Sequence, residues 1–237
     1  MNMLDPSTTK FTAASPEREP PCSGPGRLRH TAGAAVCGIA LGWLATVVDV
    51  LPVTSGRVLL VLASTGLSWG LAAFILGATS KGWRDAAAAG FVVLVAATSS
   101  YYGAIYAAGL RPKTTSSELA GAMIAWLVIA TIGGPAVGAL GWSVRQKHWT
   151  RPLALGTAGG LLGSQGAYLY GRTWDPGHFG TGQFGEILPS FLILAPAALV
   201  AFVGRRHRPW LVTLTFAVVA VVCMPLWARL HEYLQAF

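Results

Sequence analysis

Few side chains in this sequence can carry chemistry, and most of them lie in or beside long apolar segments. Asp49 is an acidic residue well inside one of these segments, within Val47-Val48-Asp49-Val50-Leu51. A carboxylate in hydrocarbon is costly, so it normally faces the protein interior and finds a partner. Two readings stay open: Asp49 reaches the outer membrane interface and pairs with Arg57, or it takes part in proton or substrate handling.

Further hydrogen-bonding side chains fall at the same expected membrane level as Asp49. Gln165 and Tyr168 are three residues apart and therefore share one side of a helix. We expect the full set to line an outward-opening polar cavity for a small-molecule cargo: Asp49, Tyr101, Tyr102, Gln165, Tyr168, Glu186, Arg229 and His231. Interhelical hydrogen bonds without any ligand explain the same residues equally well.

The sequence does not support a site for a cofactor, a metal or a catalytic nucleophile. Gly180-Thr181-Gly182-Gln183-Phe184-Gly185 matches the dinucleotide fingerprint, but it lies in an expected loop between apolar helices and not in a βαβ unit. No pair of Cys or His has ligand spacing, and Leu162 replaces the first glycine of a nucleophile elbow at Gly163-Ser164-Gln165-Gly166. We expect no cofactor, no metal and no assigned catalytic residue, and whether the chain is an enzyme stays open.

The composition indicates which solvent surrounds these residues. The chain has 237 residues, of which 53% are hydrophobic and 11% charged, and its mean hydropathy is +0.54. Soluble domains carry about 25% charged residues. Lipid is therefore the expected solvent for most of the chain, and with three cysteines a disulfide scaffold is excluded.

Seven apolar segments are long enough to be candidate membrane spans, since crossing the hydrocarbon takes about 20 residues. They cover residues 31–52, 58–79, 86–110, 119–144, 153–171, 187–204 and 209–230. The sequence predicts an all-α, polytopic transmembrane helix bundle over residues 31–237, placed in the cell membrane as a multi-pass protein. Residues 1–30 lack an apolar core and are expected to form a disordered cytoplasmic tail.

The basic residues orient this bundle. Twelve of the 17 Lys and Arg residues fall in the tail or in the loops near residues 81, 147 and 206, which share one side of the membrane. Because cytoplasmic loops retain basic residues, the N-terminus is predicted inside and the C-terminus outside. The net charge of +8 then favours anionic lipid headgroups as partners and not nucleic acid.

Glycines recur at four-residue spacing along the predicted helices. The pairs are Gly38 and Gly42, Gly134 and Gly138, Gly156 and Gly160, and Gly159 and Gly163. Such pairs let two helix backbones approach closely in lipid. We expect them to pack helices within this chain, and they leave the oligomeric state undetermined.

Two further patterns bear on the architecture. Gly133-Gly134-Pro135 and Pro196 predict irregular helices at membrane depth, either plain kinks or the broken helices that some transporters use. Gly38-Ile39-Ala40-Leu41-Gly42 also aligns with Gly159-Gly160-Leu161-Leu162-Gly163. This alignment raises the hypothesis of two parallel three-helix units joined by a fourth, inverting helix.

From Gly38 to about Tyr170 the chain resembles an uncharacterised family of small actinobacterial integral membrane proteins. The residues that carry the resemblance are Gly38-Ile39-Ala40-Leu41-Gly42, Ala63-Ser64-Thr65-Gly66-Leu67-Ser68-Trp69, Ala73-Phe74-Ile75-Leu76-Gly77, Tyr101-Tyr102, Gly133-Gly134-Pro135-Ala136-Val137-Gly138, Gln165 and Tyr168. The resemblance implies a multi-pass membrane protein and supplies no catalytic residues.

Three function classes follow from these features. The first is transport or sensing of a small molecule through the outer-half cavity. The second is a membrane-embedded enzyme acting on a lipid or isoprenoid, with Asp49, Glu186 or His231 as acid or base. The third is a membrane assembly partner without a small-molecule site.

Overall fold

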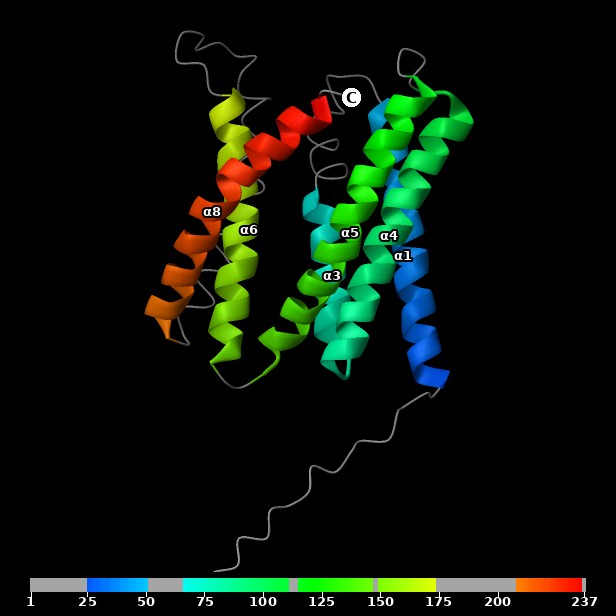
Figure 1. Cartoon of the computed structure of the whole chain (residues 1–237). Helices are drawn as coiled ribbons and strands as arrows, with labels where there is room; N and C mark the ends of the chain where they lie inside the picture. Colours follow the sequence, from blue (N-terminus) through cyan, green and yellow to red (C-terminus); the bar gives the residue numbers. More distant parts are fainter. Residues whose placement is uncertain (1–24, 51–65, 111–114, 147–148, 174–207, 236–237) are drawn as a thin grey trace, which may run out of the picture.

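A computed structural model describes residues 25–50, 66–110, 115–146, 149–173 and 208–235 of the chain. Within these ranges the secondary structure is entirely helical, which confirms the all-α prediction. The helices are α1 (Pro25–Val50), α3 (Gly66–Thr79), α4 (Trp83–Ala108), α5 (Ser116–Val144), α6 (Thr150–Thr173) and α8 (Pro209–Gln235) (Figure 1).

Four segments of these helices are long and apolar enough to cross a membrane: Leu28–Asp49, Trp83–Ala108, Ser116–Val144 and Pro209–Leu226. Large apolar side chains on them face outward, and Ile132 and Val221 are 71% and 72% exposed. A continuous apolar exterior of this kind is unusual for a soluble monomer. Length, composition and surface together indicate a membrane protein.

The observed helices match most of the predicted spans but not all of them. The four membrane-length segments correspond to the first, third, fourth and seventh predicted spans. α3 covers the second span only from Gly66, because residues 58–65 lie outside the described part of the chain. α6 covers the fifth span without being among the four, and the sixth span, residues 187–204, is not described. Seven spans and the orientation of the termini therefore stay predictions.

Local signals fix where α4 and α5 end and begin. Gly109 follows α4 with φ 60°, a left-handed conformation that suits glycine, and its N–H donates to the carbonyls of Ile105 and Tyr106. Thr115 caps α5: its hydroxyl accepts from the Glu118 N–H at 3.3 Å, and the Glu118 carboxylate accepts from the Thr115 N–H at 2.7 Å. This reciprocal capping box sets the start of α5 ahead of the predicted residue 119.

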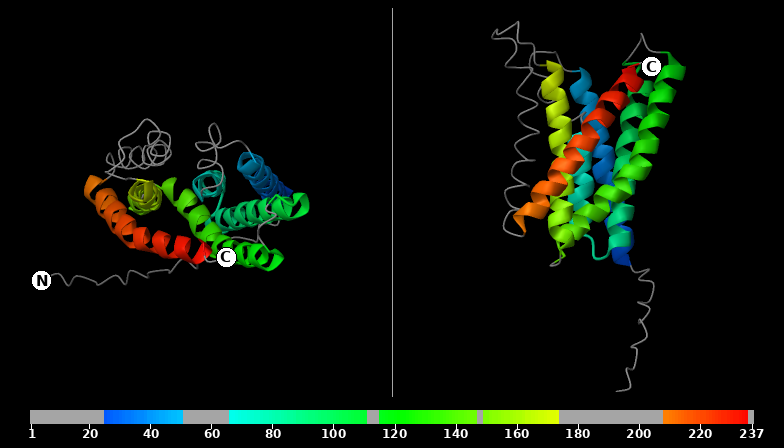
Figure 2. Two further views of the ribbon diagram at one scale, coloured as in Figure 1. Left: turned by 90° about the horizontal axis from the view of Figure 1, so that it is seen from above. Right: turned by 60° about the vertical axis from the view of Figure 1, so that its left-hand side comes forward.

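The helices pack in two groups on either side of α5. α4 packs along both α1 and α5, and α3 lies against α4 and α5. α6 and α8 form a pair on the other side of α5, as the view from above in Figure 2 shows. α5 is thus the central helix of the described bundle.

The glycine pairs lie where helix backbones come closest. A Cβ added to Gly42 of α1 would lie 2.4 Å from the Ala97 carbonyl oxygen of α4, and one added to Gly134 of α5 would lie 2.6 Å from the Gly90 oxygen of α4. Gly160 of α6 would meet the Phe216 oxygen of α8 at 2.8 Å. Close packing by glycine within the chain is confirmed.

α5 is continuous through Gly133-Gly134-Pro135, with Pro135 inside the helix. A broken helix at this point is therefore excluded. Gly134 meets the backbone of α4 instead, so the motif packs two helices and does not expose backbone groups to a cargo. Pro196 lies outside the described residues.

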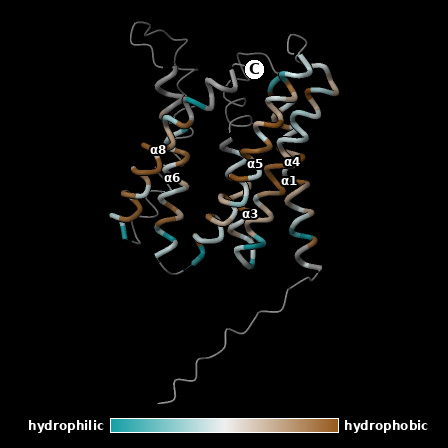
Figure 3. The backbone as a smooth tube through the Cα atoms, in the orientation of Figure 1, coloured by the Kyte–Doolittle hydropathy of each residue, from teal (hydrophilic) through white to brown (hydrophobic). Residues whose placement is uncertain are grey.

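The two ends of the bundle differ in their charged residues. α1, α4, α6 and α8 begin, and α3 and α5 finish, at the lower end in Figure 1, where hydrophilic backbone segments gather in Figure 3. We call this the basic end, because its described cations are Arg29, Lys81, Arg84, Arg145, Arg151 and Arg208. Asp49, Glu118 and Arg229 lie towards the opposite end, which we call the far end.

Candidate functional site

Two of the predicted cavity residues meet directly near the far end. The hydroxyl of Tyr101 on α4 donates a hydrogen bond to the Asp49 carboxylate in the last turn of α1. Asp49 is half-buried, whereas Tyr101 is 8% exposed. The acidic residue of the first apolar segment therefore has a partner from a different helix.

Close packing of α1 on α4 places these two groups. The Thr46 hydroxyl donates to the Gly42 carbonyl oxygen at 2.9 Å and lies 3.5 Å from the Tyr101 carbonyl oxygen. Asp49 follows Thr46 by three residues and so lies on the same face of α1. The small residue at Gly42 brings this face against α4 and carries Asp49 to the Tyr101 hydroxyl.

Aromatic rings hold Tyr101 in position. Its ring meets Trp69 of α3 edge-on, with centroids 5.9 Å apart and planes at 69°. It meets Tyr102 at 5.1 Å and 84°. Edge-to-face contacts of this kind add to the stabilisation that burial provides. We call Thr46, Asp49, Trp69, Tyr101 and Tyr102 the Asp49 cluster.

The indole nitrogen of Trp69 is an open donor in this cluster. Trp69 is 8% exposed, and its Nε1 is buried without a hydrogen-bond partner among the described residues. A buried donor left unpaired costs about 1–3 kcal/mol. Such a group, on a ring that packs against Tyr101, can donate a hydrogen bond to an acceptor atom of a small molecule.

The other predicted cavity residues lie on α6 and α8 or outside the described part of the chain. Gln165 is buried on α6, whose main packing partners are α8 and α5. Tyr168 lies on α6, and Arg229 and His231 lie on α8; Arg229 is exposed, and the side chains of Tyr168 and His231 lie outside the described set. Glu186, Arg57 and the Gly180–Gly185 motif also fall outside the described residues.

Sequence reasoning missed Trp69 and Thr46 as members of the cluster. Both are apolar-segment residues whose roles depend on a neighbouring helix. The signal for Thr46 was its position one helical turn before Asp49. Trp69 stood out only as the last residue of a segment that carries the family resemblance, which assigns it no role.

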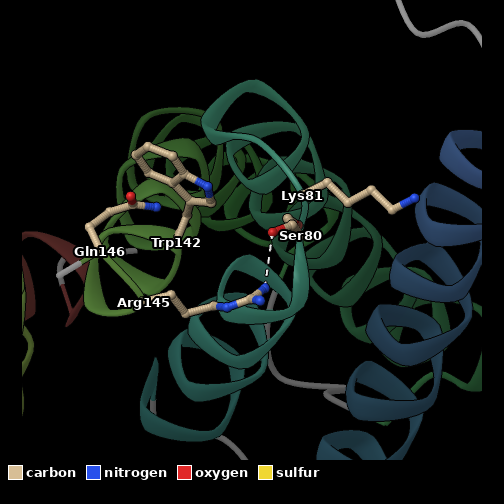
Figure 4. Close-up of a pocket in the computed structure, with 5 residues that line it drawn as sticks. All are labelled: Ser80, Lys81, Trp142, Arg145 and Gln146. Carbon is tan, nitrogen blue, oxygen red and sulfur yellow. Dashed lines mark hydrogen bonds between the residues drawn. The ribbon is translucent and has the colours of Figure 1, made fainter.

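A pocket of about 340 Å³ opens at the basic end (Figure 4). It is lined by Ser80 and Lys81 from the turn before α4 and by Trp142, Arg145 and Gln146 from the end of α5. The Arg145 guanidinium donates to the carbonyl oxygens of Ala78 at 3.0 Å and Ser80 at 3.4 Å. Ser80, Lys81, Arg145 and Gln146 fall in predicted loops and Trp142 in the predicted span 119–144, and no motif indicated a pocket.

Potential metal ligands are scattered in the described part of the chain. No group of three or more His, Cys, Asp or Glu side chains comes together there. Cys37 and Cys223 are free thiols on α1 and α8.

Comparison with known proteins places the chain in a family. Residues 23–232 match a family of unknown function, DUF6518. No curated protein and no solved structure matches the chain. The matched range contains both the Asp49 cluster and the basic-end pocket. It also agrees with the resemblance to an uncharacterised family, and the chain therefore belongs to DUF6518.

Proposed function

We propose that the chain is a multi-pass protein of the cell membrane that moves or senses a small molecule at the Asp49 cluster. Two observations carry this proposal: Tyr101 donates a hydrogen bond to Asp49, and the Trp69 ring that packs on Tyr101 has a buried Nε1 without a partner among the described residues. Structural polar groups in a membrane bundle are normally satisfied by other helices. An unpaired donor at this place fits a site that a ligand completes.

The groups of the cluster define what the ligand must offer. Trp69 Nε1–H needs an acceptor, and the Asp49 carboxylate, which accepts from Tyr101, favours a ligand that carries a donor or a positive group. The rings of Trp69, Tyr101 and Tyr102 offer apolar surface and aromatic faces. A small, partly apolar molecule that carries an acceptor near an amine or a hydroxyl fits all three requirements.

The predicted seven-span topology supports a small-molecule site at the Asp49 cluster. With the N-terminus inside, the Asp49 cluster lies in the outer half of the membrane, where an external molecule can reach it. Gln165, Tyr168, Glu186, Arg229 and His231 remain proposed members of a wider polar path on the same side. The lipid bilayer is the proposed partner of the outer surface.

The test compares cells that lack the chain with cells that carry the wild type, Asp49→Asn or Tyr101→Phe. Metabolites inside the cells and in the medium are profiled together with the membrane lipids. We expect wild type to change the distribution of at least one small molecule across the membrane. Asp49→Asn and Tyr101→Phe should abolish that change, because each removes the described bond or its charge.

Tyr106→Phe provides the matched control. Tyr106 is on the same helix, is 68% exposed and lies outside the cluster. It should behave as wild type. A change confined to lipid chemistry would favour an enzyme on a lipid or isoprenoid, and no metabolite or lipid change with wild type would favour an assembly partner; either result contradicts the proposal.

A further inference from the structure

The pocket at the basic end is lined by hydrogen-bond donors. Lys81, Arg145 and the Trp142 indole only donate, and Gln146 and Ser80 can donate as well. None of the five lining residues carries a carboxylate. A lining of this kind suits an anion.

Arg145 is held in place while part of its guanidinium stays available. Both of its described hydrogen bonds, to Ala78 and Ser80, use Nη1. Within the described residues, Nη2 and Nε therefore keep their donors for a ligand. Because one anchor carbonyl lies in the last turn of α3 and the other in the turn after it, Arg145 also fixes the two walls of the pocket to each other (Figure 4).

Ser80 ties the turn to α1 as well. Its hydroxyl donates to the Leu76 carbonyl oxygen at 2.9 Å and lies 2.9 Å from His30 Nε2. Ser80 is 3% exposed, so this wall is built into the bundle. Lys81 extends from it away from Trp142 and towards α1 in Figure 4, so its exposed ammonium adds positive charge at this end of the bundle and makes no direct contact with the other lining side chains drawn there.

The charges around the pocket are mostly positive. Arg84 lies over the Trp83 ring at 5.4 Å from the centroid, and Arg29 lies at the start of α1. Asp85 is the acidic residue nearest in sequence, and its carboxylate oxygen is 4.0 Å from the position of a Cβ on Gly82. It does not line the pocket.

We propose that this pocket binds a phosphate group. Arg145 and Lys81 supply charge, and Trp142 and Gln146 supply directed donors; guanidinium and phosphate pair strongly through charge-assisted hydrogen bonds. The group belongs either to an anionic lipid headgroup or to a free phosphate.

The position of the pocket in the bundle indicates whether a lipid headgroup can supply the phosphate. Trp83 and Trp149 at the same end of the bundle are 54% and 56% exposed, and exposed Trp residues mark the headgroup level of a membrane. A headgroup phosphate is therefore available at the pocket mouth, and in an anionic lipid no choline or amine cation offsets its charge.

The experiment uses the purified full chain in a neutral detergent. It is titrated with phosphatidylglycerol and with phosphatidylcholine, and native mass spectrometry measures the fraction of protein that carries lipid. We expect phosphatidylglycerol to bind more tightly than phosphatidylcholine. Gln146→Glu should weaken phosphatidylglycerol binding by about tenfold, since a like charge of nearly the same shape then faces the phosphate.

Two further variants separate the pocket from the general positive charge. Lys81→Gln should weaken phosphatidylglycerol binding to a smaller extent, because the Lys81 ammonium extends away from the other lining side chains. Arg84→Gln removes a cation from the same end without touching the pocket lining and should bind like wild type. Equal binding of the two lipids by wild type, or equal losses in Arg84→Gln and Gln146→Glu, would overturn the proposal.

Inorganic phosphate distinguishes the two sources. If millimolar inorganic phosphate displaces phosphatidylglycerol from wild type, the pocket takes a free phosphate. If it does not displace the lipid, the pocket recognises the headgroup within the bilayer. Gln146→Glu should weaken whichever of the two binds, and failure of both probes to bind wild type contradicts the proposal.

Discussion

At the scale of single residues, Tyr101 connects all parts of the Asp49 cluster. Its hydroxyl donates to Asp49, its ring meets Trp69 and Tyr102, and its carbonyl oxygen lies near the Thr46 hydroxyl. In an interior of low dielectric, a polar group left without its partner is more costly than it is in water. Loss of the Tyr101 hydroxyl should therefore weaken the contact between α1 and α4, whereas the ring contacts of residue 101 remain.

Tyr101→Phe should lower the free energy of unfolding by about 0.5–1.5 kcal/mol, the usual net contribution of one intramolecular hydrogen bond. The ring contacts remain, so the loss reports the hydroxyl alone. The measurement is the midpoint of thermal unfolding of the purified protein in detergent.

Tyr106→Phe is the control for this measurement, because Tyr106 is exposed on the same helix. Its midpoint should match wild type. The double variant Tyr101→Phe with Asp49→Asn should cost less than the sum of the two single changes, since both remove one interaction. Equal midpoints for Tyr101→Phe and Tyr106→Phe would show that the bond contributes nothing to stability.

The sequence allowed Asp49 and Tyr101 to be predicted as site residues, but not Trp69. A carboxylate in an apolar segment needs a partner, and that requirement is visible in the sequence. An indole in an apolar segment is ordinary, and whether its nitrogen finds an acceptor depends on the neighbouring helices. The pairing of Asp49 with Arg57 stays a prediction.

At the scale of the helices, glycine sets the spacing of the bundle. Gly90 of α4 and Gly134 of α5 face each other, and Gly138 lies against the Ala86 oxygen of the same α4. The buried hydrophobic residues of these helices are largely alanines. In lipid, close backbone contact of this kind replaces the hydrophobic drive that packs helices in water.

Gly134→Ala and Gly133→Ala form a matched pair of neighbouring substitutions. A Cβ on Gly134 would lie 2.6 Å from a backbone oxygen of α4, whereas nothing lies within 4 Å of a Cβ on Gly133. Gly134→Ala should destabilise by about 1–3 kcal/mol, because the helices must move apart. Gly133→Ala should be neutral or stabilise by up to about 1 kcal/mol through helix propensity.

Thermal unfolding in detergent measures both substitutions. The difference between the two variants is the informative quantity, since the chemical change is identical. If Gly133→Ala proves as harmful as Gly134→Ala, the position of α5 against α4 differs from the one described.

Sequence patterns located these glycines but did not assign their partners. A glycine pair predicts that the backbone of another helix comes close, but which helix does so depends on the fold. The observed helix ends differ from the predicted ones for another reason. Hydropathy gives the length of the apolar segment, whereas Gly109 and the Thr115 capping box determine where the helices end and begin. The predicted limits at residues 110 and 119 followed hydropathy.

At the scale of the whole molecule, two helix pairs resemble each other. α1 packs on α4 through Gly38 and Gly42, and α6 packs on α8 through Gly156 and Gly160. In the hypothesis of two three-helix units, these are the first and third helices of each unit, and α5 is the inverting helix between them. The common packing supports the hypothesis, whose sixth predicted span lies outside the described residues.

The separation of charge between the two ends predicts how the bundle sits in the membrane. The basic end should face the cytoplasm, and the start of α5 and the end of α8 should face outward. Single cysteines test this in a background where Cys22, Cys37 and Cys223 are replaced by Ser. A membrane-impermeant maleimide added to intact cells should label Ser116→Cys and Gln235→Cys.

Trp149→Cys is the control at the other end, because Trp149 is exposed beside the start of α6. It should react only after the cells are permeabilised. Labelling of Trp149→Cys in intact cells, with protection of Ser116→Cys, would reverse the orientation. Labelling of Ser116→Cys with protection of Gln235→Cys would place both chain termini in the cytoplasm. The number of spans would then be even, because an odd number puts the N-terminus and the C-terminus on opposite sides of the membrane. A reversed orientation would place the Asp49 cluster on the cytoplasmic side, whereas an even number of spans would leave the cluster on the outer side. The two labelling results therefore distinguish a wrong orientation from a wrong number of spans.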